Sequence, residues 1–176
     1  LFHQHLTTLT FLDPACGCGN FLVTAYRELR KLELEVLKKL RKDQKMVLFG
    51  AEDISKINVN QFYGIEIEEF PSLVARTAMY LVDHQMNMEL SQEFGQAYAR
   101  IPLREPATIV HADALVIDWQ DVIPKDKLSY ILGNPPFVGA QIMTKEQKGI
   151  LVKVFDNAKG VGNLDFVTAW YEKASK

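Results

Sequence analysis

A chain of 176 residues, of which 48% are hydrophobic, is long and apolar enough to bury one core as a single domain. Its formal net charge of −2 does not indicate the basic face typical of nucleic-acid-binding proteins, so any phosphate contacts are expected mostly outside this segment. The sequence contains no apolar run long enough to span a bilayer and begins without a signal-peptide pattern, which predicts a cytoplasmic protein without membrane contact.

The first predicted elements are a short strand and a long helix. The apolar run over 9–12, bounded by Asp13-Pro14, is typical of a buried strand that ends in a turn. Apolar residues then recur at helical spacing from Leu22 to Leu40, which predicts a long amphipathic helix. We interpret the basic cluster that follows as a solvated helix end rather than a nucleic-acid contact. The cluster consists of Lys38, Lys39, Arg41, Lys42 and Lys45.

A second strand and a second long helix come next. The run over 61–67 is apolar enough for a buried strand and is closed by carboxylates at Glu66, Glu68 and Glu69. Pro71 suits the first turn of the helix that follows. The periodicity predicts that the inner face of this helix consists of Leu73, Val74, Thr77, Ala78, Leu81 and Met86.

The rest of the chain completes an alternating pattern. Strands are predicted over 108–111 and 128–132, helices over 145–155 and from 164 onward, a short element over 47–54 and irregular structure over 87–106. Alternating strands and helices imply right-handed crossovers, so we predict an α/β fold with a doubly wound, mainly parallel sheet. Ligands of such sheets bind at the carboxyl ends of the strands, so the residues after each strand are the candidate site.

The end of the first strand is one candidate ligand site. It joins Asp13 to a small-residue turn with Gly17 and Gly19, and then to the start of a helix. Glycines let the backbone approach a ligand closely, and free amides at a helix N-terminus can receive an anionic group. A glycine turn after a strand is equally common as a purely structural solution. Cys16 and Cys18 are too close in sequence for an ordinary disulfide or a lone zinc site, so reduced thiols are expected.

Acidic side chains follow the second and third strands. An acid at the end of the second strand can accept hydrogen bonds from ribose hydroxyls, as in dinucleotide-binding folds. The alternation of sides along a strand does not choose among Glu66, Glu68 and Glu69, and each is also compatible with a solvated surface acid. Asp113 follows the third strand, where it either accepts a hydrogen bond from a base amino group or caps the next turn.

The most specific feature of the sequence is Asn134-Pro135-Pro136-Phe137, directly after the fourth strand. Consecutive prolines restrict the backbone and lack amide hydrogens, so they form a rigid corner that holds its carbonyls in a set direction. The Asn134 side-chain oxygen and the Pro135 carbonyl are then two acceptors for a planar amino group, and Phe137 offers a flat face for a base. The alternative is an Asn-Pro turn with Phe137 in the core.

These segments together resemble a known enzyme family. DPACGCGNF, GIEIEE, ADAL and GNPPF are similar, in this order, to motifs I to IV of the gamma-class amino-methylating DNA methyltransferases. The longer segments GNFLVTAYRELRKLE, QFYGIEIEEFPSLVARTAMYLVDHQMN, ILGNPPFVGA and LDFVTAWYEKA resemble the MmeI-like bifunctional restriction-modification enzymes, so the resemblance covers nearly the whole chain. It implies the Rossmann-like fold of S-adenosylmethionine-dependent methyltransferases, with S-adenosylmethionine as cofactor.

The resemblance also implies a role for each candidate residue. Residues expected to surround the methionine and ribose of the cofactor are Asp13, Ala15, Cys16 and Gly17. By the same similarity Glu66 would bind the ribose hydroxyls and Asp113 the adenine amino group of the cofactor. The family more often has Ser at the position of Cys18, a compatible change, and Asp165 weakly resembles a later motif near the active-site entrance.

For the target base, the resemblance implies that Asn134 and Pro135 accept hydrogen bonds from the amino group, in the rigid segment that includes Pro136, and that Phe137 stacks on the ring. The expected reaction is N6-methylation of a flipped-out adenine in double-stranded DNA, within a restriction-modification system. The two acceptors return electron density to the attacking nitrogen, and the sulfonium supplies the leaving group, so no metal is expected.

Other activities are weighed against this one. Methylation of a cytosine carbon is disfavoured, because both cysteines lie in the first turn rather than at the catalytic strand end. The alternatives that stay open are amino methylation of cytosine, of RNA guanine or of protein glutamine, and a nucleotide-binding module without catalysis. Since the family core has seven strands and a DNA-recognition domain, we expect residues 1–176 to be a partial, truncated catalytic domain that binds cofactor weakly and does not methylate DNA alone.

Overall fold

The computed structural model describes residues 2–42, 55–94 and 106–176, and the short element expected over 47–54 lies outside these ranges. The helices and strands are α1 (Phe2–Leu6), β1 (Phe11–Asp13), α2 (Asn20–Lys42), β2 (Phe62–Glu66), α3 (Glu69–Phe94), β3 (Thr108–His111), β4 (Tyr130–Ile131), α4 (Lys145–Val154) and α5 (Thr168–Ser175). Among the described residues, four short 3-10 turns, η2 to η5, lie between them. The alternation of strands and helices predicted from the sequence is confirmed.

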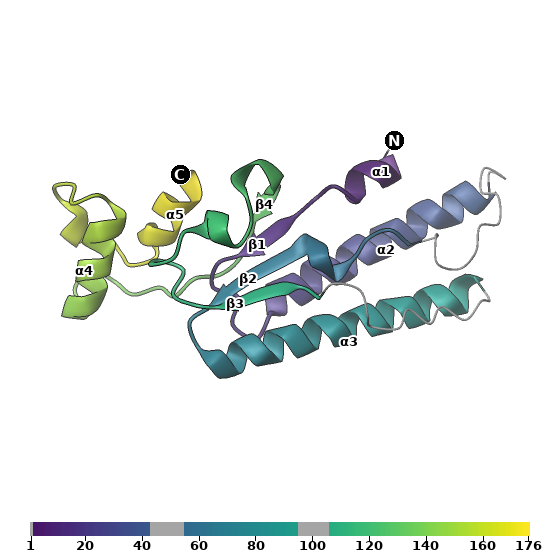
Figure 1. Ribbon diagram of the computed structural model, residues 1–176, viewed down its shortest axis with the longest axis horizontal. Helices are drawn as coiled ribbons and strands as arrows, with labels where there is room; N and C mark the ends of the chain where they lie inside the picture. The colour runs from purple at the N-terminus through teal and green to yellow at the C-terminus, as the bar shows by residue number, and fades with distance from the viewer. Residues whose placement is uncertain (1, 43–54, 95–105) are drawn as a thin grey trace.

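The strands form one parallel sheet in the order β3-β2-β1-β4. Phe11 of β1 pairs with Phe62 of β2 on one side and with Tyr130 of β4 on the other. The chain thus moves outward from β1 to β3 and then returns to the opposite side of β1, as Figure 1 shows. The predicted doubly wound α/β sheet is confirmed, and its switch point lies between β1 and β4.

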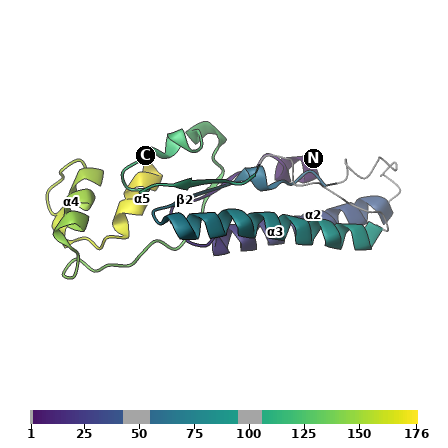
Figure 2. The same cartoon turned by 60° about the horizontal axis from the view of Figure 1, so that its bottom comes forward.

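The two faces of the sheet are covered differently. Helices α2 and α3 run side by side beneath one face, and the segment after β3 covers the other face (Figures 1 and 2). Alternate strand residues divide between two core clusters, so that Phe62 faces the long helices while Leu12 and Ile65 face the other side. Within the described ranges, no helix has both the length and the apolar character needed to cross a membrane.

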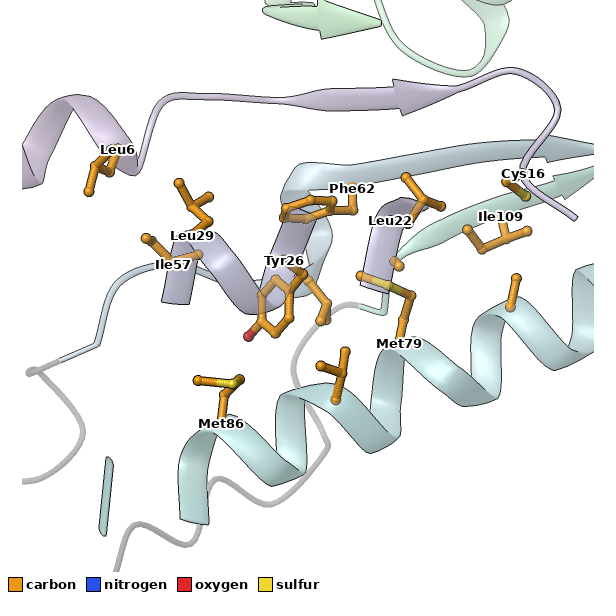
Figure 3. Close-up of a cluster of buried hydrophobic side chains, with 14 residues drawn as sticks. Leu6, Cys16, Leu22, Tyr26, Leu29, Ile57, Phe62, Met79, Met86 and Ile109 are labelled. Carbon is orange, nitrogen blue, oxygen red and sulfur yellow. The ribbon is translucent and has the colours of Figure 1, made fainter. Parts of the chain in front are cut away.

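The core beneath the sheet is built from aromatic and flexible apolar side chains (Figure 3). Tyr26 of α2 and Phe62 of β2 make an edge-to-face contact, with ring centroids 5.4 Å apart. Met79 and Met86 reach this cluster from α3, and both are almost completely buried. Full burial of one such side chain contributes about 1.5–3 kcal/mol, so this layer holds both long helices against the sheet.

The inner face of α3 differs from the prediction. Its buried residues are Ser72, Ala75, Met79, Val82, Met86, Asn87 and Leu90. Of the six residues expected on that face, Met86 is buried, Val74 and Ala78 are half-buried, and Leu73, Thr77 and Leu81 are exposed. The prediction failed because α3 has apolar residues on opposite sides, so periodicity alone could not select the side that packs on the core.

Several element boundaries also differ. Helix α3 continues to Phe94 where irregular structure was expected from residue 87, because Asn87 and Leu90 are buried on its inner side. The buried Arg30 of α2 donates to Asp83 at 3.1 Å and to Asn87 at 2.9 Å, which joins the two helices. Strand β4 has only two residues, and α5 begins at Thr168 rather than at residue 164.

Candidate active site

The polar residues predicted to form the site lie at one edge of the sheet. Asp13 and Glu66 are the last residues of β1 and β2, while Asp113 and Asn134 follow β3 and β4 by two or three residues. Because all four strands are parallel, their carboxyl ends share this edge. Backbone bonds continue the pairing past the strands, since the Ala112 amide donates to the Glu66 carbonyl at 2.9 Å. The fold therefore gathers these groups, as the sequence predicted.

The turn after β1 is tight because a glycine permits it. Gly19 has a φ of +84°, and a Cβ added there would lie 3.1 Å from the Cβ of Ala75. The start of α2 can therefore approach α3 closely only without a side chain at this position. Gly17, by contrast, faces open space, since a Cβ added there would meet nothing within 4 Å among the described residues. At Gly17 the turn thus presents backbone rather than a side chain.

Asp13 is a buried carboxylate with one oxygen unused. Its Oδ1 accepts a hydrogen bond from the Ala15 amide at 3.0 Å, while Oδ2 is buried and has no partner among the described residues. Burial raises the pKa of Asp13 to about 6, the charge of Glu66 adds to the rise, and the Ala15 amide opposes it. A buried acceptor without a partner is costly, which makes this oxygen well suited to a ligand that brings a donor or a positive charge.

Of the three carboxylates at the end of β2, Glu66 is the one that contacts the glycine turn. Its Oε2 accepts from the Gly17 amide at 2.8 Å, and its Oε1 accepts from the Glu68 amide at 2.9 Å. Glu68 and Glu69 are exposed, whereas Glu66 is half-buried. Glu66 therefore ties the end of β2 to the glycine turn after β1, a choice that strand alternation alone left open.

Asp113 has the local role that one of the two sequence interpretations predicted. Its Oδ1 accepts from the Leu115 amide at 2.8 Å, and its carbonyl accepts from the amides of Val116 and Ile117. These bonds cap the turn that follows β3. The side chain is half-buried and lies two residues beyond the strand, so the cap also holds the carboxylate at the sheet edge.

Ala15 and Cys16 differ in burial and in contacts within the turn after β1. Ala15 is half-buried and donates its amide to Asp13, whereas the Cys16 thiol points into the core with Leu22 and Ile109 (Figure 3). Burial, aided by the charges of Asp13 and Glu66, raises the pKa of Cys16 to about 12, so the thiol is neutral. Both cysteines are free, and Cys18 is exposed.

The segment Asn134-Pro135-Pro136-Phe137 leaves the sheet without entering a helix or strand. Asn134 and Pro136 are exposed and Pro135 is half-buried. Phe137 is 73% exposed, which contradicts the alternative that placed this ring in the core. An exposed aromatic ring a few residues from Asn134 and Pro135 is a surface that a planar group can contact.

The far end of this segment is held by residues before α5. The Phe166 amide donates to the Val138 carbonyl at 2.8 Å, and Asp165 Oδ1 accepts from the Ala140 amide at 2.9 Å. Asp165, which matched a later motif only weakly, therefore supports the segment. A cavity of about 560 Å³ beside β4 is separate, because none of the predicted site residues lines it.

Two residues at the site were not identified from the sequence. The Trp170 indole on α5 donates to the Pro14 carbonyl at 3.1 Å across 156 positions of chain, a contact that no local pattern signals. Gly133 precedes Asn134, and a Cβ built on it would lie 2.4 Å from Asp13 Oδ1. Gly133 is part of the GNPPF segment, but its steric role depends on β4 lying beside β1 and could not be predicted from the segment alone.

Comparisons with known proteins identify the family of this chain. The family model for the DNA-methyltransferase domain of MmeI matches residues 1–176. DNA methyltransferase A of Bacillus subtilis (strain 168) is 36% identical over 171 residues, which are 96% of this chain and 19% of that protein. The chain therefore spans about a fifth of the length of this curated relative.

Solved structures include two that share the fold. The type IIL restriction-modification enzyme MmeI, solved in complex with DNA, superposes with a TM-score of 0.91 at 56% identity, over 99% of this chain and 23% of that one. A nuclease-deletion mutant of the type ISP restriction-modification enzyme LlaGI superposes with a TM-score of 0.54 at 16% identity, over 96% of this chain and 14% of that one. The second likeness supports the fold alone.

Proposed function

The chain belongs to the MmeI DNA-methyltransferase domain family, and from this premise we propose that it forms the catalytic site of an adenine-N6 DNA methyltransferase of a restriction-modification system. The observation that carries the proposal is the arrangement at the strand switch point. There the buried Asp13 carboxylate ends β1, while the exposed Asn134 and the half-buried Pro135 follow the adjacent strand β4. A cofactor site and an acceptor site for an amino group thus share one edge of the sheet.

The residues at this edge suit S-adenosylmethionine. The methionine part of this molecule carries two positive groups, an ammonium and a sulfonium, and Asp13 has a buried oxygen without a partner in the described part of the chain. Glu66 lies close enough to raise the pKa of Asp13, so two acids face the same region. The methionine and ribose of the cofactor would be held by Asp13, Ala15, Cys16 and Gly17, with Cys16 contributing its backbone. Glu66 would bind the ribose, and Asp113 would bind the adenine. When bound, the cofactor supplies an electrophilic methyl group with a good leaving group.

Asn134 and Pro135 act on the target amino group. The nitrogen is a weak nucleophile because its lone pair is delocalised into the base. When the Asn134 side-chain oxygen and the Pro135 carbonyl accept its two hydrogens, electron density returns to the nitrogen and the positive charge that develops there is stabilised. The adjacent Pro136 keeps these acceptors from turning, and Phe137 stacks on the ring, worth about 1–3 kcal/mol per base.

The target adenine must leave the duplex to reach this site. The related enzyme MmeI was solved with DNA, and we propose duplex DNA as the partner of the full-length parent of this chain. The chain itself has a formal net charge of −2, and Lys38 is already paired with Glu35 and Glu93. The phosphate contacts that dominate DNA affinity therefore belong mainly to other parts of the parent protein.

The test is methyl transfer by the full-length parent from labelled S-adenosylmethionine, followed by mass spectrometry of the modified product. We expect N6-methyldeoxyadenosine in duplex DNA. Asn134→Ala should lower kcat at least 100-fold, because one transition-state acceptor is lost, while the cofactor dissociation constant stays within about threefold. Gln92→Ala, which removes an exposed amide near the end of α3, is the matched control and should retain full activity.

Each other outcome contradicts a specific part of the proposal. Label in deoxycytidine, in RNA guanosine or in protein glutamine would show that the proposed substrate is wrong, although the amino-group chemistry would still hold. Cofactor binding without transfer to any of these substrates would identify a nucleotide-binding module. Full activity of Asn134→Ala would remove the acceptor role from this segment.

A further inference from the structure

Gly133 occupies a special place at the switch point of the sheet. Strands β1 and β4 are adjacent and parallel, with Leu12 paired to Ile131, and the Leu132 amide donates to the Leu12 carbonyl at 2.9 Å. Asp13 ends β1 and Gly133 follows β4, so these two residues meet where the neighbouring strands end. Gly133 is also the residue directly before Asn134.

The contact between the two residues leaves no room for a side chain. A Cβ built on Gly133 would lie 2.4 Å from Oδ1 of Asp13 and 3.0 Å from its Cγ, closer than real Cβ contacts allow. The φ of Gly133 is +152°, a backbone conformation that residues with side chains rarely adopt. The Asp13 carboxylate therefore lies directly against the backbone that leads into Asn134.

The carboxylate is the partner less able to move. Asp13 is completely buried, and its Oδ1 is held by the Ala15 amide at 3.0 Å. The next residue, Pro14, is buried, and its carbonyl accepts the indole hydrogen of Trp170. By contrast Gly133 and Asn134 are exposed. A side chain at position 133 would thus displace the strand end and the acceptors after it, rather than the carboxylate.

We propose that Gly133 is a positioning residue, which sets the place of Asn134 and Pro135 through direct contact of its backbone with the Asp13 carboxylate. The cofactor side and the amino-group side of the site are then held in register by one steric contact across β1 and β4. This inference rests on the proposed function, because it concerns the two halves of that site. A displacement of about 1 Å at reacting groups can lower the rate on the order of 100-fold, so loss of this contact should measurably slow methyl transfer.

The kinetic test uses Gly133→Ala in the full-length parent. We expect kcat for DNA methylation to fall about 100-fold, while the dissociation constant for S-adenosylmethionine stays within about threefold. The matched control is Gly149→Ala on α4, where an added Cβ meets nothing within 4 Å among the described residues. A Gly133→Ala enzyme with full kcat overturns the proposal, as does a loss that lies wholly in cofactor binding.

A second measurement does not depend on activity. In hydrogen exchange of the same proteins, Gly133→Ala should speed exchange at least tenfold in peptides covering 128–136, which include the Leu132 amide. Asp13→Ala removes the three atoms that the new Cβ would meet. In the Asp13→Ala background, Gly133→Ala should therefore accelerate exchange at least threefold less than it does when Asp13 is present. If Gly133→Ala accelerates exchange equally with Asp13 and with Asp13→Ala, the proposed contact is contradicted. If this pattern is found but the unmodified parent transfers no methyl group, the proposed function fails while the contact stands.

Discussion

At the scale of single residues, the chemistry of the site depends on how one carboxylate is buried. Asp13 lies at the end of β1 with no solvent exposure, and one of its two oxygens lacks a partner among the described residues. The backbone amide of Ala15 offsets only part of the cost of burying the charge, so the pKa of Asp13 rises to about 6. The carboxylate therefore changes its charge within an accessible pH range.

This raised pKa predicts how stability depends on pH. The folded chain holds the Asp13 proton from about pH 4 to pH 6, where the unfolded chain has lost it, so Asp13 makes the protein less stable as pH rises through this window. The total effect is on the order of 3 kcal/mol. In urea unfolding of the 176-residue chain, Asp13→Asn should gain stability relative to the unmodified protein between pH 4 and pH 7. Parallel pH curves for the two proteins would show that Asp13 does not titrate in this way.

The same carboxylate predicts the pH dependence of cofactor affinity. Only the ionised form of Asp13 attracts a positively charged ligand, so affinity for S-adenosylmethionine should rise as pH increases from 5 to 7, through the pKa near 6. Calorimetric titration of the full-length parent should also detect proton release on binding near pH 6. Asp13→Asn should weaken binding and remove the release. Retention of the proton release in Asp13→Asn would assign the titration to another group.

Phe137 offers a residue-scale test of base stacking. The ring is 73% exposed, so Phe137→Ala should change the free energy of unfolding by less than about 0.5 kcal/mol. The loss of stacking should cost about 1–3 kcal/mol in kcat/KM for DNA, measured with the full-length parent. Phe2→Ala is the matched control, because Phe2 is 55% exposed but lies on α1, which precedes β1 at the opposite end of the sheet (Figure 1). Equal losses for the two variants would argue against a specific contact.

At the scale of elements, α3 illustrates that an amphipathic pattern does not define its own orientation. Met79 faces the sheet and is 1% exposed, while Leu81 points away and is 59% exposed. The buried side includes polar Ser72 and Asn87, and the outer side includes the apolar Phe70 and Leu73. The orientation follows from tertiary contacts, chiefly the packing on Phe62 and Tyr26 and the Arg30 bonds.

This orientation predicts opposite results for two substitutions on α3. Met79→Ala should lower the free energy of unfolding by about 2–4 kcal/mol, because it leaves a cavity beneath the sheet. Leu81→Ala should change it by less than about 0.5 kcal/mol, because the side chain is largely solvated. Urea unfolding of the chain measures both. A larger loss for Leu81→Ala than for Met79→Ala would mean that α3 packs with its other side on the core.

At the scale of the whole molecule, the chain carries no excess of basic residues. Its formal net charge is −2, and Lys38 in the basic cluster of α2 is paired with acids. The side chains of Arg41 and Lys45 lie outside the described part of the structure. The low charge is consistent with the proposed separation, in which this chain performs the chemistry and other parts of the parent protein bind the DNA phosphates.

This separation predicts weak DNA binding by residues 1–176 alone. We expect dissociation constants in the nonspecific range of about 10⁻⁴–10⁻⁶ M, and a shallower dependence on salt than that of the full-length parent, because fewer phosphates are neutralised. Fluorescence anisotropy with a labelled duplex at two salt concentrations measures both quantities. If the isolated chain binds the duplex with a submicromolar dissociation constant and the same salt dependence as the parent, the main DNA contacts lie in this segment.

Much of the fold could be predicted because the signals are local. The order of strands and helices follows from apolar periodicity and turn residues, and β3 at Thr108–His111 has the predicted bounds. Parallel pairing follows from that order through crossover handedness, and it brings Asp13, Glu66 and Asn134 to one edge. Strand lengths and the end of α3 were less predictable, because they depend on partners in other elements.

By itself the sequence determined the order of the elements, the parallel sheet and the identity of the strand-end groups, since each depends on residues within a few positions of one another. Only the tertiary structure decided which carboxylate after β2 binds the glycine turn, which side of α3 is buried, and that Phe137 is exposed. It also decided that Gly133 must lack a side chain. The physical reason is the same in each case: burial and close contact are properties of pairs of residues that lie far apart in the chain and meet only when the sheet forms.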